Sequence, residues 1–199
     1  MNLKTINKKI WIPVAVVAVV LLGLVASYNG LVTKRQAVQN ALSNIDTQYQ
    51  RRADLIPNLV STVKGAANFE QKTLEDLVAA RAKATSIQLD VSKATPEQIL
   101  AYQNAQGDVT QALGKLLAIT ENYPQLQAVQ AFRDLQSQLE GTENRITVAR
   151  KDYNDAVKVY DTKLQHFPTN LTAGLFGFNQ APYFKADAGA STVPAVKFN

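Results

Sequence analysis

The chain has 199 residues, which suits one domain with a short appendage, and 21 lysines and arginines exceed 16 aspartates and glutamates to give a formal net charge of +5. Lys4, Lys8 and Lys9 lie within the first nine residues, so the remainder is nearly neutral and lacks the clustered basic surface of a nucleic-acid-binding protein. Cysteine is absent and histidine occurs once, which excludes disulfides, thiolate nucleophiles and zinc sites built from cysteine or several histidines.

The first predicted element is a single transmembrane helix at residues 10–28, behind a basic flank at residues 1–9. Ile10 to Ser27 form 18 residues without a charge, close to the ~20 apolar residues that cross a bilayer core as a helix. Trp11 and Tyr28 flank this run, and we interpret them as anchors at the two membrane–water interfaces. The lipid bilayer is therefore the first expected partner.

A cleaved signal peptide is the alternative interpretation of the same run. Lysines precede it, and Val25-Ala26-Ser27 has the small residues of a cleavage site. The run is longer than the ~7–15 apolar residues of an ordinary signal peptide, which favours an uncleaved anchor.

The charges on either side of the run bear on its orientation. Lys4, Lys8 and Lys9 precede it, whereas Lys34 and Arg35 are the first positive residues after it. Because positive charge accumulates on the cytoplasmic side, we expect a cytoplasmic N-terminus and a body outside.

Residues 29–167 are predicted to form a helical bundle without a sheet. Positions in residues 38–63 recur at alternating steps of four and three, a spacing typical of a coiled-coil-like seam. Nothing strong enough to stop a helix separates this seam from the membrane run, so one helix could continue to about Gly65. The seam positions are Val38, Leu42, Ile45, Tyr49, Arg52, Ile56, Leu59 and Val63.

A second long helix is predicted from Pro124 to about His166. Its seam positions lie seven residues apart: Phe132, Leu139, Ile146, Tyr153, Tyr160 and Phe167.

Two shorter helices are predicted between the long ones. The first covers residues 68–84, and a linker at 86–94 follows it. The second starts at Thr95, with proline next and Gln98 three residues after the cap. The expected fold is thus all-α, an antiparallel bundle of four helices, two long and two shorter, with an irregular C-terminal tail at 168–199.

Arg52 is the exceptional residue of the first seam, because it stands where an aliphatic side chain is expected. A buried charge needs a partner, so we expect an acidic residue against it. Pro57 should bend the same helix, because proline removes one intrahelical hydrogen bond. Two interpretations stay open: an ion-pair cluster that sets helix register, or a site for a partner or ligand. The candidate residues are Arg51, Arg52, Asp54, Pro57, Glu75, Glu121, Glu143, Arg145 and Arg150.

Motifs that carry catalysis are missing from the sequence. It contains no P-loop, no GxGxxG, no GxSxG and no Glu-x-x-His pair. We therefore expect a protein that is not an enzyme and that has no cofactor and no metal site. A hydrolase that uses carboxylates inside the bundle is the enzymatic alternative.

Several motifs resemble the LemA family of bacterial membrane proteins. The longest is Gln50-Arg51-Arg52-Ala53-Asp54-Leu55-Ile56-Pro57-Asn58-Leu59-Val60, and shorter ones are Glu121-Asn122-Tyr123-Pro124, Glu143-Asn144-Arg145-Ile146, Tyr153-Asn154 and Phe167-Pro168. The resemblance implies long antiparallel helices behind an N-terminal membrane helix, without accepted catalytic residues. One departure is Asp161, which follows Tyr160 where the family often has asparagine.

The expected function is a non-enzymatic, membrane-anchored scaffold or adaptor of the bacterial cell envelope. It would act in the inner membrane through an unknown membrane protein partner or through self-association, without nucleic acid. A membrane-shaping oligomer and an accessory factor of a membrane protease are the alternatives.

Overall fold

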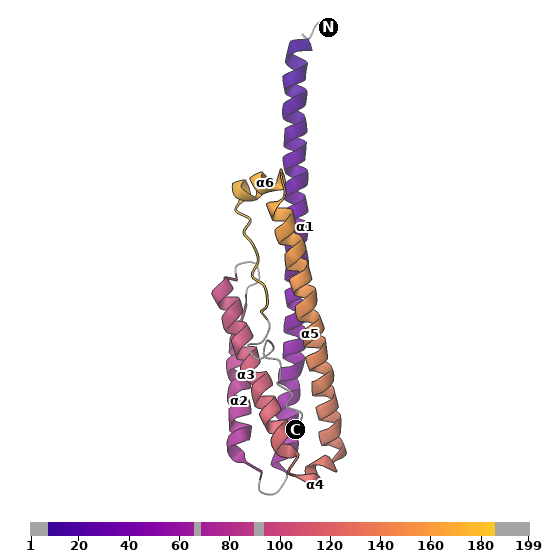
Figure 1. Ribbon diagram of the computed structural model, residues 1–199, viewed down its shortest axis with the longest axis vertical. Helices are drawn as coiled ribbons and strands as arrows, with labels where there is room; N and C mark the ends of the chain where they lie inside the picture. The colour runs from indigo at the N-terminus through magenta and orange to yellow at the C-terminus, as the bar shows by residue number, and fades with distance from the viewer. Residues whose placement is uncertain (1–7, 66–68, 90–93, 186–199) are drawn as a thin grey trace, which may run out of the picture. The chain divides into compact units, whose positions relative to one another are not determined.

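The computed structural model describes residues 8–65, 69–89 and 94–185 (Figure 1). Within these ranges the regular secondary structure is entirely helical, which confirms the all-α prediction. The helices are α1 (Lys8–Lys64), α2 (Gln71–Ser86), α3 (Pro96–Thr120), α4 (Pro124–Gln127), α5 (Gln130–Gln165) and α6 (Thr169–Phe176). They divide into two compact units, residues 1–38 with 155–181 and residues 39–154 with 182–199.

Helix α1 runs without interruption from Lys8 to Lys64, as expected from the lack of a strong stop signal. Among the described residues it is the one helix long and apolar enough to cross a membrane, and none of its most apolar stretch is buried. Every position of the first predicted seam, from Val38 to Val63, is buried.

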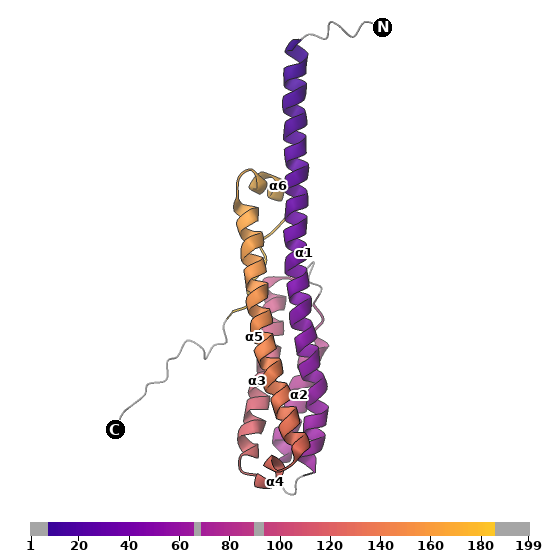
Figure 2. The same cartoon turned by 90° about the vertical axis from the view of Figure 1, so that its right-hand side faces the viewer.

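The hydrophobic core of the second unit draws on five helices. Ile56 and Leu59 come from α1, Leu77 from α2, Leu116 from α3 and Phe132 from α5. Leu126 of the short α4 joins them. Figures 1 and 2 show α1 and α5 side by side along this unit.

Helix α3 begins as the sequence predicts. The Thr95 hydroxyl accepts a hydrogen bond from the Gln98 N–H, and the Gln98 side chain accepts one from the Thr95 N–H. Two otherwise unpaired N–H groups are thereby satisfied at the helix start.

The second long helix is not continuous from Pro124, and this part of the prediction is wrong. The chain leaves the helix after α4, and α5 starts at Gln130. Leu126 and Phe132 are both buried in the same core. Six residues apart on one α-helix, they would point roughly a third of a turn apart, so the break lets both face inward.

The segment from residue 168 was expected to be irregular, but Thr169–Phe176 forms helix α6. Residues 177–185 are non-helical, and residues 186–199 lie outside the described residues. Phe167 was assigned to the second seam, yet 79% of it is exposed. Its place in the seam is wrong because α5 ends at Gln165, and a residue before proline avoids helical geometry.

Two polar pairs on α5, seven residues apart, bind the non-helical segment through its backbone. In the first unit the Tyr160 hydroxyl donates to the Asn179 carbonyl (2.9 Å), and Asp161 Oδ1 accepts from the Ala181 N–H (3.1 Å). In the second unit the Tyr153 hydroxyl donates to the Pro182 carbonyl (2.8 Å). The Asn154 amide meets both backbone groups of Phe184, at 3.0 and 2.9 Å.

Asp161→Asn should remove a pH-dependent loss of stability. Burial raises the pKa of the Asp161 carboxyl, and the Ala181 N–H opposes this only in part. The folded state then binds the proton more tightly, so the free energy of unfolding should fall as the pH rises above about 4, through the raised pKa. The variant, unfolded in detergent at a series of pH values, should match the wild type in acid and exceed it at neutral pH.

Asn154→Asp is the matched control for this measurement. It places a second carboxylate in the equivalent pair and should add a loss of stability above the same pH. If Asp161→Asn and the wild type show the same pH dependence, the carboxyl is not desolvated as described.

Candidate functional site

The candidate site is built around Arg52, which is 1% exposed although it carries a charge. The seam of α1 turns this position inward, so the guanidinium must find its partners inside the protein. Its Nη1 donates to the Thr110 hydroxyl (2.7 Å) and to Glu143 Oε1 (2.6 Å). Its Nη2 donates to the backbone and side-chain oxygens of Gln106, at 3.0 and 2.7 Å.

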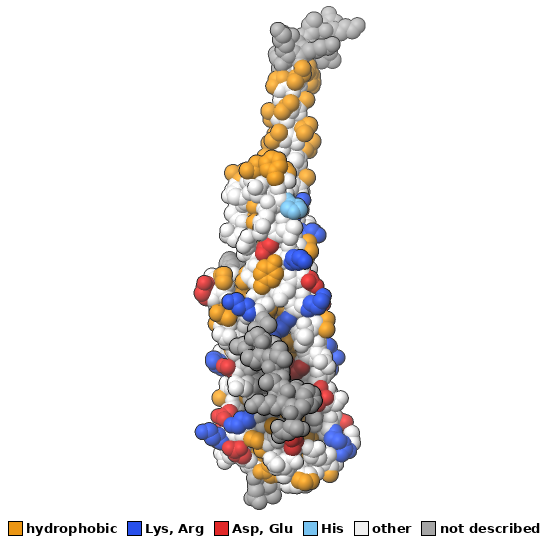
Figure 3. All heavy atoms as spheres, in the orientation of Figure 1, with side chains coloured by type: hydrophobic (Ala, Val, Ile, Leu, Met, Phe, Trp, Pro, Cys, Tyr) orange, Lys and Arg blue, Asp and Glu red, His pale blue; other side chains and the backbone are white. Residues whose placement is uncertain are grey.

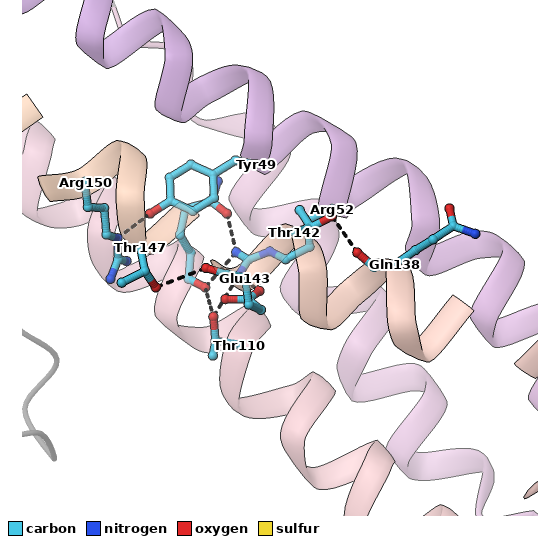
Figure 4. A network of polar contacts seen from close by, with 9 residues as sticks. Tyr49, Arg52, Thr110, Gln138, Thr142, Glu143, Thr147 and Arg150 are labelled. Carbon is cyan, nitrogen blue, oxygen red and sulfur yellow. Dashed lines mark hydrogen bonds and ion pairs between the residues drawn. The ribbon is translucent and has the colours of Figure 1, made fainter. Parts of the chain in front are cut away.

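These partners come from different helices, as Figure 4 shows for Thr110 and Glu143. Gln106 and Thr110 lie one turn apart on α3, and Glu143 lies on α5. The side chain of Glu143 is 35% exposed, so the ion pair with Arg52 is buried on one side only. All four Nη hydrogens have acceptors, so a ligand could bind them only by displacing an internal partner.

Aromatic rings complete the surroundings of the guanidinium. The Arg52 Cζ lies 5.1 Å from the centroid of the Tyr49 ring, within the range of a cation–π contact. Arg150 donates from Nε to the Tyr49 hydroxyl at 2.9 Å. Burial raises the pKa of the Tyr49 phenol, and the two guanidinium groups oppose that effect. The phenol therefore stays protonated at neutral pH.

A second tyrosine continues the cluster toward α3. The rings of Tyr49 and Tyr102 meet edge to face with centroids 5.4 Å apart. The Tyr102 hydroxyl donates to Asp46 Oδ1 at 2.8 Å, and burial raises the pKa of this phenol strongly. A cleft of about 410 Å³ is lined in part by Asp46, Tyr49, Tyr102 and Gln106.

The polar groups around Arg52 form ion pairs and hydrogen bonds with one another. Within the ranges that the structure describes, no three histidine, aspartate or glutamate side chains could hold a metal ion. The nearby cleft contains phenols with raised pKa values and one carboxylate already bonded to Tyr102. The two phenols, whose pKa values burial raises, are protonated and therefore weak nucleophiles at neutral pH.

Pro57 creates a separate polar contact on the same helix. Proline has no N–H, so the carbonyl of Ala53, four residues earlier, loses its helical donor. Arg81 of α2 supplies the missing donor, with its Nε 2.7 Å from that carbonyl oxygen. Helix α1 continues through Pro57 to Lys64, and a side chain of the neighbouring helix satisfies the freed group.

The structure brings only part of the predicted candidate set together. Glu143 forms an ion pair with Arg52, and Arg150 donates a hydrogen bond to Tyr49, whose ring lies against Arg52. Asp54, another of the four acidic candidates, does not pair with Arg52, because residues two apart on a helix point in different directions. Asp54 is exposed and accepts from Gln50 at 2.8 Å.

The remaining candidates stand on the surface. Glu75 accepts a hydrogen bond from Gln71 at 2.7 Å, on its own helix. The other exposed candidates are Arg51, Pro57, Glu121 and Arg145. Of the two expected interface anchors, Trp11 is exposed and Tyr28 is partly covered by the rings of Phe176 and Phe178.

Sequence reasoning missed the uncharged partners of Arg52. The apolar face of the helix after Pro96 runs Ile99, Tyr102, Val109, Leu113, and its regular spacing has a gap at Gln106. A polar residue in a gap of a buried seam is a signal, and Gln106 is indeed buried. Thr110 gave no comparable signal.

Comparisons with known proteins agree with the resemblance described above. The LemA family model matches residues 41–198. Magnetosome protein MamQ 2 of Paramagnetospirillum magneticum is 28% identical over 85% of this chain and 68% of its own length. Magnetosome protein MamQ of Magnetospirillum gryphiswaldense is 26% identical over the same shares. Protein LemA of Metamycoplasma hominis is 25% identical over 79% of this chain and 68% of its own.

Arg52→Ala should lower the free energy of unfolding by about 3 kcal/mol, because it leaves Glu143, Gln106 and Thr110 without a donor. Denaturant unfolding of the full chain in detergent, followed by circular dichroism, measures the change. Arg51→Ala is the matched control: the neighbouring arginine is exposed and should cost less than ~0.5 kcal/mol. Equal effects of the two substitutions would contradict a central role for the Arg52 contacts.

Pro57→Ala and Arg81→Ala should be coupled. Arg81→Ala alone leaves the Ala53 carbonyl without a donor, at a cost of about 1–3 kcal/mol. In the double variant the alanine N–H at position 57 takes over, so most of that cost should disappear. A double-mutant cycle on the unfolding free energy measures the coupling.

Lys83→Ala is the control for this cycle, because Lys83 lies on the same helix and pairs with Asp108 on the surface. It should show no coupling to Pro57→Ala. Additive effects of Pro57→Ala and Arg81→Ala would mean that the Arg81 hydrogen bond does not replace the missing N–H.

Proposed function

This chain belongs to the LemA family, and we propose that it is a non-enzymatic, membrane-anchored scaffold or adaptor of the bacterial cell envelope. The observation that carries the proposal is the composition of α1. One uninterrupted helix holds both a fully exposed apolar stretch and the buried seam that contains Arg52. An apolar stretch of this length without a protein cover suits a lipid environment.

The anchor is a single pass through the inner membrane. Family membership and the apolar helix support a membrane-associated helical protein. The lysines before the run favour a cytoplasmic N-terminus with the body outside. In this arrangement residues 1–9 are a basic flank, 10–28 the transmembrane helix and 29–167 the bundle.

The bundle is an antiparallel arrangement of four helices. Its support lies within residues 39–154, where α1, α2, α3 and α5 share one core. The ribbon views draw α2 and α3 in opposite directions and α1 and α5 likewise (Figures 1 and 2). The Arg52 contacts would then set the register of α1 against α3 and α5, as single polar residues do in helical seams.

A groove between α1 and α2 is the surface best suited to a protein partner. It has a volume of about 760 Å³, and Val60, Phe69, Leu74 and Val78 supply its apolar lining. Val78 is exposed within it, next in sequence to the buried Leu77. An apolar groove of this kind accepts the apolar face of a partner helix or a second copy of the chain.

A membrane-organising oligomer is the second candidate. The names of the MamQ relatives connect them with the magnetosome, which favours a role at a specialised membrane. The two candidates differ in what the purified protein does without a partner: an organising oligomer should change vesicle morphology alone, whereas an adaptor should not.

The scaffold proposal predicts a stoichiometric association. Full-length protein purified in detergent should recover a membrane protein partner or form a homo-oligomer of defined mass. Val78→Glu should reduce the recovery at least ~10-fold, because a charge in an apolar interface costs more than 1.4 kcal/mol. Affinity capture with mass spectrometry, and light scattering for the mass, provide the readout.

Val159→Glu is the matched control for this experiment. Val159 is exposed to the same fraction as Val78 but lies on α5, so the substitution should leave the association unchanged. A lone, monodisperse monomer with the wild-type sequence would contradict the scaffold proposal. Equal recovery with Val78→Glu would remove the groove from it.

A further inference from the structure

Helix α6 presents its large apolar side chains outward and its small residues inward. Thr169, Thr172 and Ala173 are its buried residues. Leu171 and Leu175, four residues apart and therefore on one face, are 62% and 71% exposed. A helix of a soluble domain buries its large apolar face, so α6 has the reverse arrangement.

Neighbouring rings extend this apolar surface at both ends of α6. Phe167 precedes the helix and is 79% exposed, and Phe176 closes the helix with its ring half exposed. The helix itself, Thr169–Phe176, contains no charged residue. A contiguous apolar surface of this kind indicates a binding partner or a lipid surface.

The position of α6 in its unit favours a lipid surface over a protein partner. The ring of Phe176 lies edge to face with Tyr28 of α1, with centroids 4.9 Å apart, and Phe178 approaches the same ring at 5.6 Å. Tyr28 directly follows the apolar run that starts near Trp11. Tyr28 lies seventeen positions after Trp11 on the helix, a rise of roughly 25 Å, close to the thickness of a bilayer core.

Tyr28 therefore stands at the level of one membrane–water interface, and α6 stands against it. Figure 3 shows hydrophobic side chains gathered on α6 next to the apolar part of α1. The last turn of α5 packs against α1 just after Tyr28. The Lys163 side chain lies beside Gly30, where an added Cβ atom would be 3.8 Å from the Lys163 Cε. A lysine beside an apolar helix at this level is typical of a membrane interface.

We propose that α6, together with Phe167, lies in the interface of the bilayer and inserts Phe167, Leu171, Leu175 and Phe176 among the lipid chains. This rests on the proposed membrane anchor. Because α6 has no charge, its insertion depends on burial of apolar area and should not depend on salt in a neutral bilayer. The first unit then contacts the bilayer at two places: α1 crosses it, and α6 lies in its interface.

Tryptophan fluorescence tests the proposal directly, because the chain has a single tryptophan, Trp11. The wild type and the double variant Trp11→Phe/Leu171→Trp are reconstituted in phosphatidylcholine vesicles with bromine near the top of the acyl chains. Bromine quenches only a ring at its own depth. We expect Trp11 and the tryptophan at position 171 to lose emission to a comparable degree, and 0.5 M salt should leave that loss unchanged.

Trp11→Phe/Val148→Trp is the matched control, since Val148 is an exposed residue of α5 that lies 15 positions, roughly 22 Å of helix, before Lys163, and its emission should not change. If position 171 is not quenched while Trp11 is, the inference about α6 is overturned. If Trp11 is not quenched, the membrane anchor itself fails. Leu175→Trp in the same background replaces the first variant if that variant loses its helical circular dichroism signal.

Discussion

The hydrogen bonds of the Arg52 guanidinium constrain α3 and α5 against α1 within residues 39–154. A charge removed from water must keep all its partners, and those partners lie on α3 and α5. Arg81 adds a contact from α2 to the backbone of α1. Apolar side chains tolerate small sliding movements between helices, whereas these polar contacts do not, so we infer that they select one register from several that the apolar seams allow.

Helix α1 contains two positions that need a partner from another helix, Arg52 and Pro57. Arg52 introduces a charge into a buried seam, and its partners come from elsewhere in the chain. Pro57 removes a backbone donor, and the replacement again comes from a neighbouring helix. In both cases a polar group of α1 has its hydrogen-bond partner on a neighbouring helix of the packed unit. The packed arrangement thereby avoids the cost of burying a charge or a carbonyl group without a partner.

Local patterns in the sequence predicted what depends on local spacing. The seam of α1 and the capping box at Thr95 follow from residues a few positions apart, and both are present. The break before Gln130 depends on Leu126 and Phe132 reaching one core, which no local pattern reveals. Arg52 was recognised as an anomaly because charge is conspicuous in a seam, and Glu143 was one of four acids considered. The sequence does not identify Gln106 and Thr110 as partners of Arg52, because uncharged hydrogen-bond acceptors are also common on protein surfaces.

The segment after α6 is bound to α5 through its main chain. Tyr153 and Tyr160 donate to carbonyl groups, and Asn154 and Asp161 accept from N–H groups, so the backbone of this segment supplies every group in these hydrogen bonds. Any residue that keeps the extended backbone presents the same carbonyls, and even Pro182 serves, since only its carbonyl is used. Substitution should therefore cost little stability in the segment, except at the buried Phe184, whose ring packs edge to face on Tyr153, and should cost more on the helix. Sequence variation among related chains should be concentrated accordingly, with the α5 residues changing least.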